Sequence, residues 1–226
     1  MTILVIAAHP DDEILGCGGT IARLVQEGQI AVAVILGEGV TSRYESTDPS
    51  VQSKIRKLHA KSADSAKTVG IEQVVWHNLP DNKFDTLPLL SVVKIIEQEI
   101  SKFKPDMIFT HHGGDLNIDH SVVFRAVLTA TRPAGITQVK DIYCFEIPSS
   151  TEWAFSSLEP VWKPNVFFDI SNTLEVKIKA LKSYSNEMRK PPHPRSYKNI
   201  RDMAYSWGAT IGTKAAEAFQ VVRSIK

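Results

Sequence analysis

Short runs of apolar, mostly β-branched residues alternate with longer stretches of helical periodicity, and this alternation constrains the fold more than any other feature of the chain. The first three runs span residues Thr2–Ala8, Ile30–Leu36 and Gln73–Trp76. Strands that read as continuous apolar runs are usually covered by helices on both faces. The sequence therefore predicts an α/β protein in which a mostly parallel sheet lies between helices.

The later segments continue this pattern. Further helices are predicted over three ranges: 51–69, 87–103 and 119–132. Further strands are predicted over residues 107–111, 141–147 and 165–170. From Thr173 onward the chain is predicted to be helical, with a break at "KPPHPRS" (190–196), because proline cannot continue a helix. No repeat or linker divides the chain, so we expect a single domain over residues 1–226.

Composition excludes several classes of protein. The 226 residues are 43% apolar and carry a formal net charge of +1, which favours neither a nucleic acid nor an acidic membrane surface as a partner. The longest N-terminal apolar run is too short for a membrane span. Two cysteines, Cys17 and Cys144, stand far apart in sequence, so we expect a reduced, cytoplasmic protein, monomeric or a homo-oligomer.

One imidazole and two carboxylates follow the first predicted strand directly, in "HPDD". Functional groups gather beyond the carboxyl ends of parallel strands. An aspartate here could simply cap the next helix, but a cap uses one carboxylate and leaves His9 and the second aspartate without a role. His9 and Asp12, three residues apart, can instead offer a nitrogen and an oxygen to a divalent metal.

A second cluster, "FTHHGGDLNIDHSVV" (109–123), follows the predicted strand 107–111 and should meet the first at the same sheet edge. A catalytic zinc usually takes three protein ligands and leaves one position for water. Among the histidines of this cluster, His120 stands at a helix start after a carboxylate, as in the first motif. His59 and His77 have no such neighbours and are expected to be surface or core residues.

The motifs "AHPDDEILGCGGT" (8–20) and "DLNIDH" (115–120) resemble those of the zinc-dependent N-deacetylases of the PIG-L/LmbE family. That family includes the de-N-acetylase of glycosylphosphatidylinositol synthesis, deacetylases of mycothiol and bacillithiol synthesis, and diacetylchitobiose deacetylases. The resemblance implies a Rossmann-like, three-layer fold over most of the chain. It also implies a hydrolase with one zinc ion per chain that removes acetyl from an N-acetylated sugar, of the N-acetylglucosamine type, as a sugar nucleotide or glycoconjugate precursor.

Carried over to this sequence, the resemblance implies that His9, Asp12 and His120 bind the metal and that Asp11 is the general base. An amide carbonyl is a poor electrophile, so hydrolysis needs a Lewis acid and a carboxylate that takes a proton from water. Asp119, next to a ligand, is expected to orient a neighbouring group without binding the metal.

The group that stabilises the oxyanion is left open by the sequence. The family often carries a histidine three positions before the metal histidine, and here that position is Asn117. An asparagine amide donates a hydrogen bond but carries no charge. His193, in "PPHPRS", is a candidate replacement, unless its prolines only shape a loop.

Two further residues are predicted to contact the substrate, because each follows a strand at the same sheet edge. Arg43 belongs to "GEGVTSRY" after the second strand, and Asp81 belongs to "LPDNKFD" after the third. Carboxylates accept hydrogen bonds from sugar hydroxyls, and a guanidinium group suits paired oxygens. Either residue could instead form a salt bridge or a solvated loop.

Three other functions remain as alternatives. A metal-dependent phosphoesterase needs ligands for two ions about 3.5 to 4 Å apart, and the donors here favour one ion. A non-catalytic sugar-binding protein would not need Asp11. "GCGG" (16–19) suggests a dinucleotide loop, but it lacks the GxGxxG order. Gly18 and Gly19, inside a helix, instead predict a close approach of the backbone to a neighbouring segment.

Overall fold

The computed structural model describes residues 1–44, 48–133 and 139–226 and contains a seven-stranded sheet of order β3-β2-β1-β4-β5-β7-β6. The parallel part consists of β1 (Thr2–Ala7), β2 (Ile30–Gly37), β3 (Gln73–Leu79), β4 (Met107–His111) and β5 (Asp141–Phe145). The strand β7 (Ala216–Arg223) runs antiparallel between β5 and β6 (Val166–Asp169). The prediction of a mostly parallel sheet between helices is confirmed.

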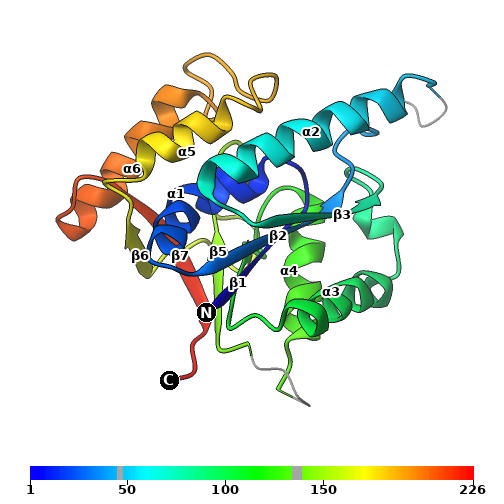
Figure 1. Ribbon diagram of the computed structural model, residues 1–226, viewed down its shortest axis with the longest axis horizontal. Helices are drawn as coiled ribbons and strands as arrows, with labels where there is room; N and C mark the ends of the chain where they lie inside the picture. Colours follow the sequence, from blue (N-terminus) through cyan, green and yellow to red (C-terminus); the bar gives the residue numbers. More distant parts are fainter. Residues whose placement is uncertain (45–47, 134–138) are drawn as a thin grey trace.

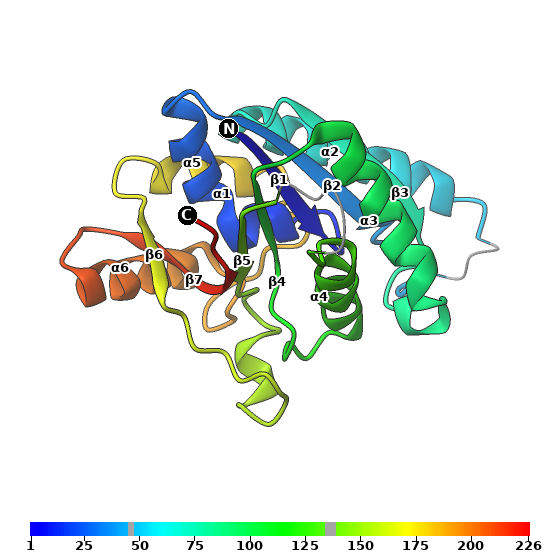
Figure 2. The same ribbon diagram turned by 90° about the horizontal axis from the view of Figure 1, so that it is seen from below.

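Helices cover both faces of the sheet (Figures 1 and 2). One face packs against α1 (Asp12–Gln26), α2 (Val51–Val69), α5 (Leu174–Leu181) and α6 (Tyr197–Ile211). The other face packs against α3 (Leu89–Phe103) and α4 (Ile118–Ala130). Short 3-10 turns lie at Phe84–Thr86 and Glu152–Ala154. In the described part of the chain, no helix has the length and hydropathy needed to cross a bilayer.

The prediction of a helical tail is wrong for its last segment. The helix α6 ends at Ile211 and is capped by Gly212, which has a φ of 76°, and residues 216–223 then form β7 rather than more helix. Alanine and glutamate favour helices, but Ala216–Phe219 are buried and pair with β6 along their whole length. Burial and strand pairing between distant segments override the local preference here.

The close approach predicted for Gly18 and Gly19 is found at Gly19 and also at Gly16, whereas Gly18 lies nearest to Ile14 of its own helix. A Cβ atom at Gly19 would lie 2.8 Å from Cδ1 of Ile170, and one at Gly16 would lie 2.4 Å from the ring of Phe145. The helix is kinked at Cys17, and the buried amides of Gly19 and Thr20 donate to the Glu217 carboxylate. The lysine Lys177 neutralises that buried carboxylate at 2.6 Å. The opening helix is therefore anchored to the C-terminal part of the chain.

Candidate metal centre and active site

The two histidine and aspartate clusters meet at one edge of the sheet. The strands β1 and β4 pair in parallel with Ile6 opposite Thr110, so the loops that follow them lie side by side. Strand order also reverses at this point, since β2 lies on one side of β1 and β4 on the other. Ligands of open α/β sheets bind at such a point. The predicted convergence of the two clusters is confirmed.

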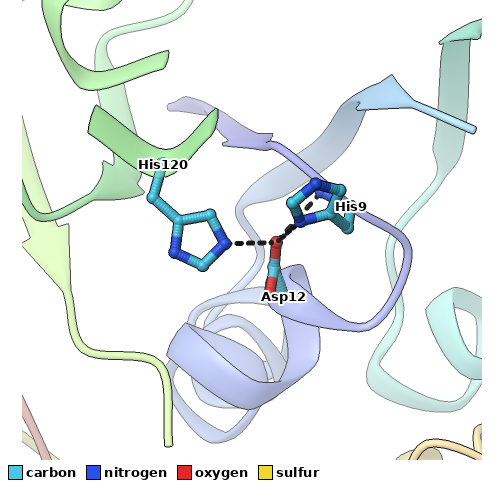
Figure 3. A group of neighbouring side chains, drawn as sticks. All are labelled: His9, Asp12 and His120. Carbon is cyan, nitrogen blue, oxygen red and sulfur yellow. Dashed lines mark hydrogen bonds and ion pairs between the residues drawn. The ribbon is translucent and has the colours of Figure 1, made fainter. Parts of the chain in front are cut away.

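Three side chains converge at this edge (Figure 3). Oδ2 of Asp12 lies 3.3 Å from Nδ1 of His9 and 3.3 Å from Nε2 of His120. The donor atoms lie within 4.8 Å of one another, and both Asp12 and His120 are buried. Two imidazole nitrogens and one carboxylate oxygen are a common ligand set of a catalytic zinc.

The hydrogen bonding of these residues also fits a metal. Oδ1 of Asp12 and Nε2 of His120 are buried but have no hydrogen-bond partner. Buried polar atoms are nearly always paired, so a cation bound between these atoms would satisfy both. The carboxylates around His9 stabilise positive charge at this position. Although burial disfavours the charged ring, Asp119 and Asp12 raise the pKa of His9 to about 10.

Carboxylates also support both histidines from the side away from Asp12. Asp119 lies 2.9 Å from Nε2 of His9, and Asp115 lies 3.0 Å from Nδ1 of His120. Asp115 accepts hydrogen bonds from the hydroxyls of Ser150 and Thr151, which fix it in place. Asp119 is hydrogen-bonded to His9, whereas Asp115 is a charged neighbour of Nδ1 of His120 without a hydrogen bond to it. Carboxylates beside the second ring nitrogen set the orientation of metal-binding histidines. The sequence analysis did not single out Asp115, although it opens the motif "DLNIDH".

A further histidine, His111, supports this arrangement without joining it. Its ring stacks on that of His120, with 3.9 Å between centroids. Nε2 of His111 accepts a hydrogen bond from the backbone amide of Ala8, so this nitrogen carries no proton. Burial and the neighbouring His120 lower the pKa of His111 well below its usual range. The stacked, neutral ring packs behind His120.

Asp11 and Asp12 are adjacent but differ in environment. Burial raises the pKa of Asp11 to about 7, and Arg195 opposes this shift only in part. Burial alone would raise the pKa of Asp12, but the neighbouring His120 outweighs this effect and holds the pKa well below its usual range. A carboxylate that titrates near neutrality suits a general base, whereas one that stays ionised suits a metal ligand.

The backbone at Asp11 is held in an unusual conformation. Its φ is 112°, a value that side-chain-bearing residues rarely adopt, and its side chain does not cap α1. The amide of Asp11 donates to Oε2 of Glu13, and Oε1 of Glu13 accepts from the hydroxyl of Tyr184 at 2.6 Å. Strain of this kind persists where surrounding contacts enforce it, and it often marks a functional residue. The capping interpretation therefore does not account for Asp11.

A polar cavity of about 210 Å³ opens beside this cluster. It is lined by His9, Pro10, Asp11, Gly39, Ser42, Arg43, Leu58, Asp81, Asn82, Asn117, Glu187 and Arg195. Both predicted substrate residues thus reach it. In the structure, Arg43 pairs with Glu187 at 3.0 Å, and Asp81 accepts from Ser42 and lies 3.3 Å from Nε2 of His9.

The structure separates the two residues proposed for the oxyanion. Asn117 lines the cavity, caps α4 by accepting from the amide of Asp119, and donates to Asn82. His193 is absent from the cavity lining. It instead packs against Trp153, and its Nδ1 accepts from the amide of Arg195. The side chain of "PPHPRS" that reaches the cavity is Arg195, which the sequence analysis did not consider.

Comparison with known proteins agrees with this arrangement. Residues 4–131 match the family model described as "PIG-L: GlcNAc-PI de-N-acetylase", and these residues contain both clusters. The chain belongs to the PIG-L family. The fold and the enzyme class implied by the sequence motifs, a metal-dependent N-deacetylase, are confirmed at the level of the family.

Two curated relatives and one solved structure show the extent of the similarity. The chain is 30% identical to the uncharacterized deacetylase YaiS of Escherichia coli, over 81% of this chain and 90% of the relative. It is 25% identical to the diacetylchitobiose deacetylase of Thermococcus kodakarensis, over 99% of this chain and 84% of the relative. The 4-carboxy-2-hydroxymuconate hydratase of Pseudomonas putida has a similar structure, with a TM-score of 0.78 at 18% identity. The similarity covers 100% of this chain and 97% of the hydratase chain. This last likeness shows the fold alone.

Proposed function

We propose that this PIG-L family member is a zinc-dependent hydrolase that removes the acetyl group from an N-acetylglucosamine-type sugar. The observation that carries the proposal is the pairing of a three-donor metal centre with a separate, buried carboxylate, Asp11, at the mouth of one polar cavity. The diacetylchitobiose deacetylase among its relatives acts on a substrate of this kind.

His9, Asp12 and His120 would hold one zinc ion, which, when bound, polarises the amide carbonyl and makes water a better acid. Asp11 then takes the proton from the attacking water and returns it to the leaving amine. Its Oδ2 is held by Arg195, whereas Oδ1 accepts no hydrogen bond from the described residues. That free oxygen is the proposed proton acceptor. Asp119 keeps the His9 ring in place.

The cavity residues suit a sugar. The volume of the cavity is about 210 Å³, below the roughly 300 to 1,000 Å³ of pockets for drug-sized ligands. This small volume favours a single sugar ring. Arg43 and Asp81 offer donors and acceptors to the hydroxyls. Asn117 is the proposed uncharged donor to the oxyanion. The structure does not bring His193 into the cavity, and we no longer propose a catalytic role for it.

The test combines metal analysis with amine release from a panel of N-acetylated sugars, offered free, nucleotide-linked and glycoconjugate-linked. We expect one zinc ion per chain and release of acetate from at least one N-acetylglucosamine derivative. Metal-loaded protein that releases no amine from any member of the panel would contradict the proposal.

The phosphoesterase alternative is less well supported. In the described part of the chain, two groups of donors are close enough to hold an ion, and both need His9. They use opposite nitrogens of one ring, because Nδ1 faces Asp12 and Nε2 faces Asp81 and Asp119. Ions bound at both groups would therefore lie on opposite sides of the His9 ring, whereas two-metal phosphoesterases hold their ions about 3.5 to 4 Å apart. A sugar-binding protein would not need the buried carboxylate and strained backbone of Asp11.

We further propose that the enzyme works in the cytoplasm. Cys17 and Cys144 are both free and buried, as expected in a reducing compartment. Fractionation of the native cells tests this location, and sedimentation tests whether the protein forms a homo-oligomer.

A further inference from the structure

Arg195 is the one residue of the 190–196 segment that lines the cavity, and it contacts Asp11 directly. Its Nη1 donates to Oδ2 of Asp11 at 2.9 Å. Its Nε donates to the carbonyl of Pro148 at 3.2 Å and to the hydroxyl of Ser149 at 3.0 Å. The guanidinium group is planar, so these contacts at two edges fix its orientation as well as its position.

The backbone of this segment is held as well. The amide of Arg195 donates to Nδ1 of His193, and the following residue, Ser196, caps α6 by accepting from the amide of Asn199. The arginine side chain is only 21% exposed. Within the described residues, the side chain of Arg195 donates to Asp11 through Nη1 and to the Pro148-Ser149 turn through Nε, whereas Nη2 makes no hydrogen bond.

Asp11 needs such a partner, because its side chain has few others. The carboxylate is 4% exposed and accepts no hydrogen bond from the start of α1, although the residue stands at the N-cap position. A carboxylate rotates freely about its last bond unless one oxygen is fixed. Since Arg195 fixes Oδ2, Oδ1 is left as the oxygen that can receive a proton.

We propose that Arg195 is a positioning residue for the general base: it clamps Oδ2 of Asp11 so that Oδ1 faces the substrate cavity. The proposal rests on the proposed function for its catalytic consequence, but the clamp itself is a property of the fold. It also gives the proline-rich segment a role, because the turns at residues 190–196 carry the arginine to the cavity.

The kinetic test uses Arg195→Ala, Arg195→Lys and, as a matched control, Arg189→Ala. Arg189 lies nearby and is exposed, and its side chain donates only to the carbonyls of Asn186 and Met188. Its backbone amide donates to the carbonyl of Arg195, a bond that the alanine variant keeps. We expect Arg195→Ala to lower kcat about 10- to 100-fold with little change in KM or zinc content, as when other orienting partners are removed. Added guanidinium ion should restore part of the loss, and Arg189→Ala should resemble the wild type. Thermal unfolding identifies any variant that fails to fold. If Arg195→Ala fails to fold, Arg195→Lys takes its place. Arg195→Lys keeps the charge but loses the contact with Pro148 and Ser149, so we expect it to lower kcat by a smaller factor.

A double-mutant cycle decides whether Arg195 acts through Asp11. If it does, Arg195→Ala should cause no further loss of kcat in the Asp11→Asn background. An equal loss in both backgrounds, or an Arg195→Ala enzyme with wild-type kcat, would overturn the proposal.

A structural test does not depend on turnover and so separates this proposal from the proposed function. Crystal structures of the wild type and of Arg195→Ala should show the Asp11 carboxylate ordered in the first and rotated or disordered in the second. An unmoved, well-ordered carboxylate in Arg195→Ala would refute the clamp, even if the wild type hydrolysed every sugar tested. Conversely, a wild type inactive on the whole panel would refute the deacetylase proposal and leave the clamp to be decided by these two structures.

Discussion

Nε2 of His9 lies 2.9 Å from Oδ2 of Asp119, whereas Nδ1 of the same ring lies 3.3 Å from Oδ2 of Asp12. The ring is therefore held on one side and faces the proposed metal centre on the other. Asp119 also accepts from the amides of Asn82 and Phe84, so the loop after β3 is tied to the same carboxylate. One aspartate thus connects the proposed metal centre to a wall of the polar cavity.

Removal of any proposed metal ligand should release the ion. Purified wild type should contain about one zinc ion per chain, and His9→Ala, Asp12→Ala and His120→Ala should each contain close to none. Elemental analysis after dialysis measures this. His77→Ala is the control, since His77 pairs with Glu99 away from the cavity. Two tightly bound ions per chain would favour the phosphoesterase.

Loss of the support behind His9 should weaken metal binding without abolishing it. We expect Asp119→Asn to lower zinc affinity about 10- to 100-fold, because the ring loses a charged acceptor at Nε2. Competition with a chelator gives the affinity. Asp85→Asn changes an exposed aspartate close to the same loop and should leave the affinity unchanged. Equal affinities for wild type and Asp119→Asn would show that the ring is held by other contacts.

Asp11 and Asp12 should respond differently to the same substitution. Asp11→Asn keeps the size and the metal but removes the base, so deacetylation should fall by a factor on the order of 10² to 10⁴ with zinc content near wild type. Asp12→Asn should lose zinc. Parallel measurements of rate and metal content distinguish the two. If Asp11→Asn strips the metal, the roles are exchanged, and if it keeps full activity, the base is another group.

The residues of the sugar pocket should affect catalytic efficiency more than metal content. Arg43→Ala should lower kcat/KM about 10- to 100-fold by removing a charged hydrogen-bond donor. Asp81→Ala should do the same, with some loss of zinc affinity because Asp81 also contacts His9. Arg125→Ala, at an exposed position of α4, serves as the control. Wild-type efficiency in both pocket variants across the sugar panel would place the sugar elsewhere.

Glu146 should make the fold less stable at alkaline pH. Burial raises its pKa from 4.5 to about 7, although the indole of Trp207 donates to it at 2.8 Å. The folded state therefore binds this proton more tightly than the unfolded state, and the free energy of unfolding falls as pH rises from about 4.5 through 7. The full shift in the pKa of Glu146 corresponds to a change of roughly 3 kcal/mol in the free energy of unfolding.

The variant Glu146→Gln keeps an acceptor for Trp207 and removes the charge. Urea unfolding should show that it gains stability over the wild type at pH 8 but little at pH 4. Glu72→Gln, at an exposed position, should follow the wild type at both values. A difference between Glu146→Gln and wild type that does not depend on pH would mean that Glu146 stays protonated, or stays ionised, throughout this range.

The sequence by itself determined the parallel part of the sheet and the place of its chemistry. Apolar runs mark β1, β2 and β4, and the helix predicted over residues 51–69 coincides with α2. The two clusters were predictable because the carboxyl ends of neighbouring parallel strands must share an edge. These features depend on local periodicity and on one general rule of topology, so a single sequence is enough to predict them.

Only the tertiary structure decided which side chains complete the site. Asp11 and Arg195 meet across 184 positions of sequence, and Asp115, which lies beside His120, accepts hydrogen bonds from Ser150 and Thr151, 35 and 36 positions away. The strand β7 forms because β5 and β6 lie on either side of it, against the helical preference of its first residues. Such pairings depend on how distant segments pack, and neither periodicity nor residue spacing contains that information. The sequence therefore predicted that His9, Asp12 and His120, which stand beside strand ends, come together, and it missed the arginine that contacts Asp11.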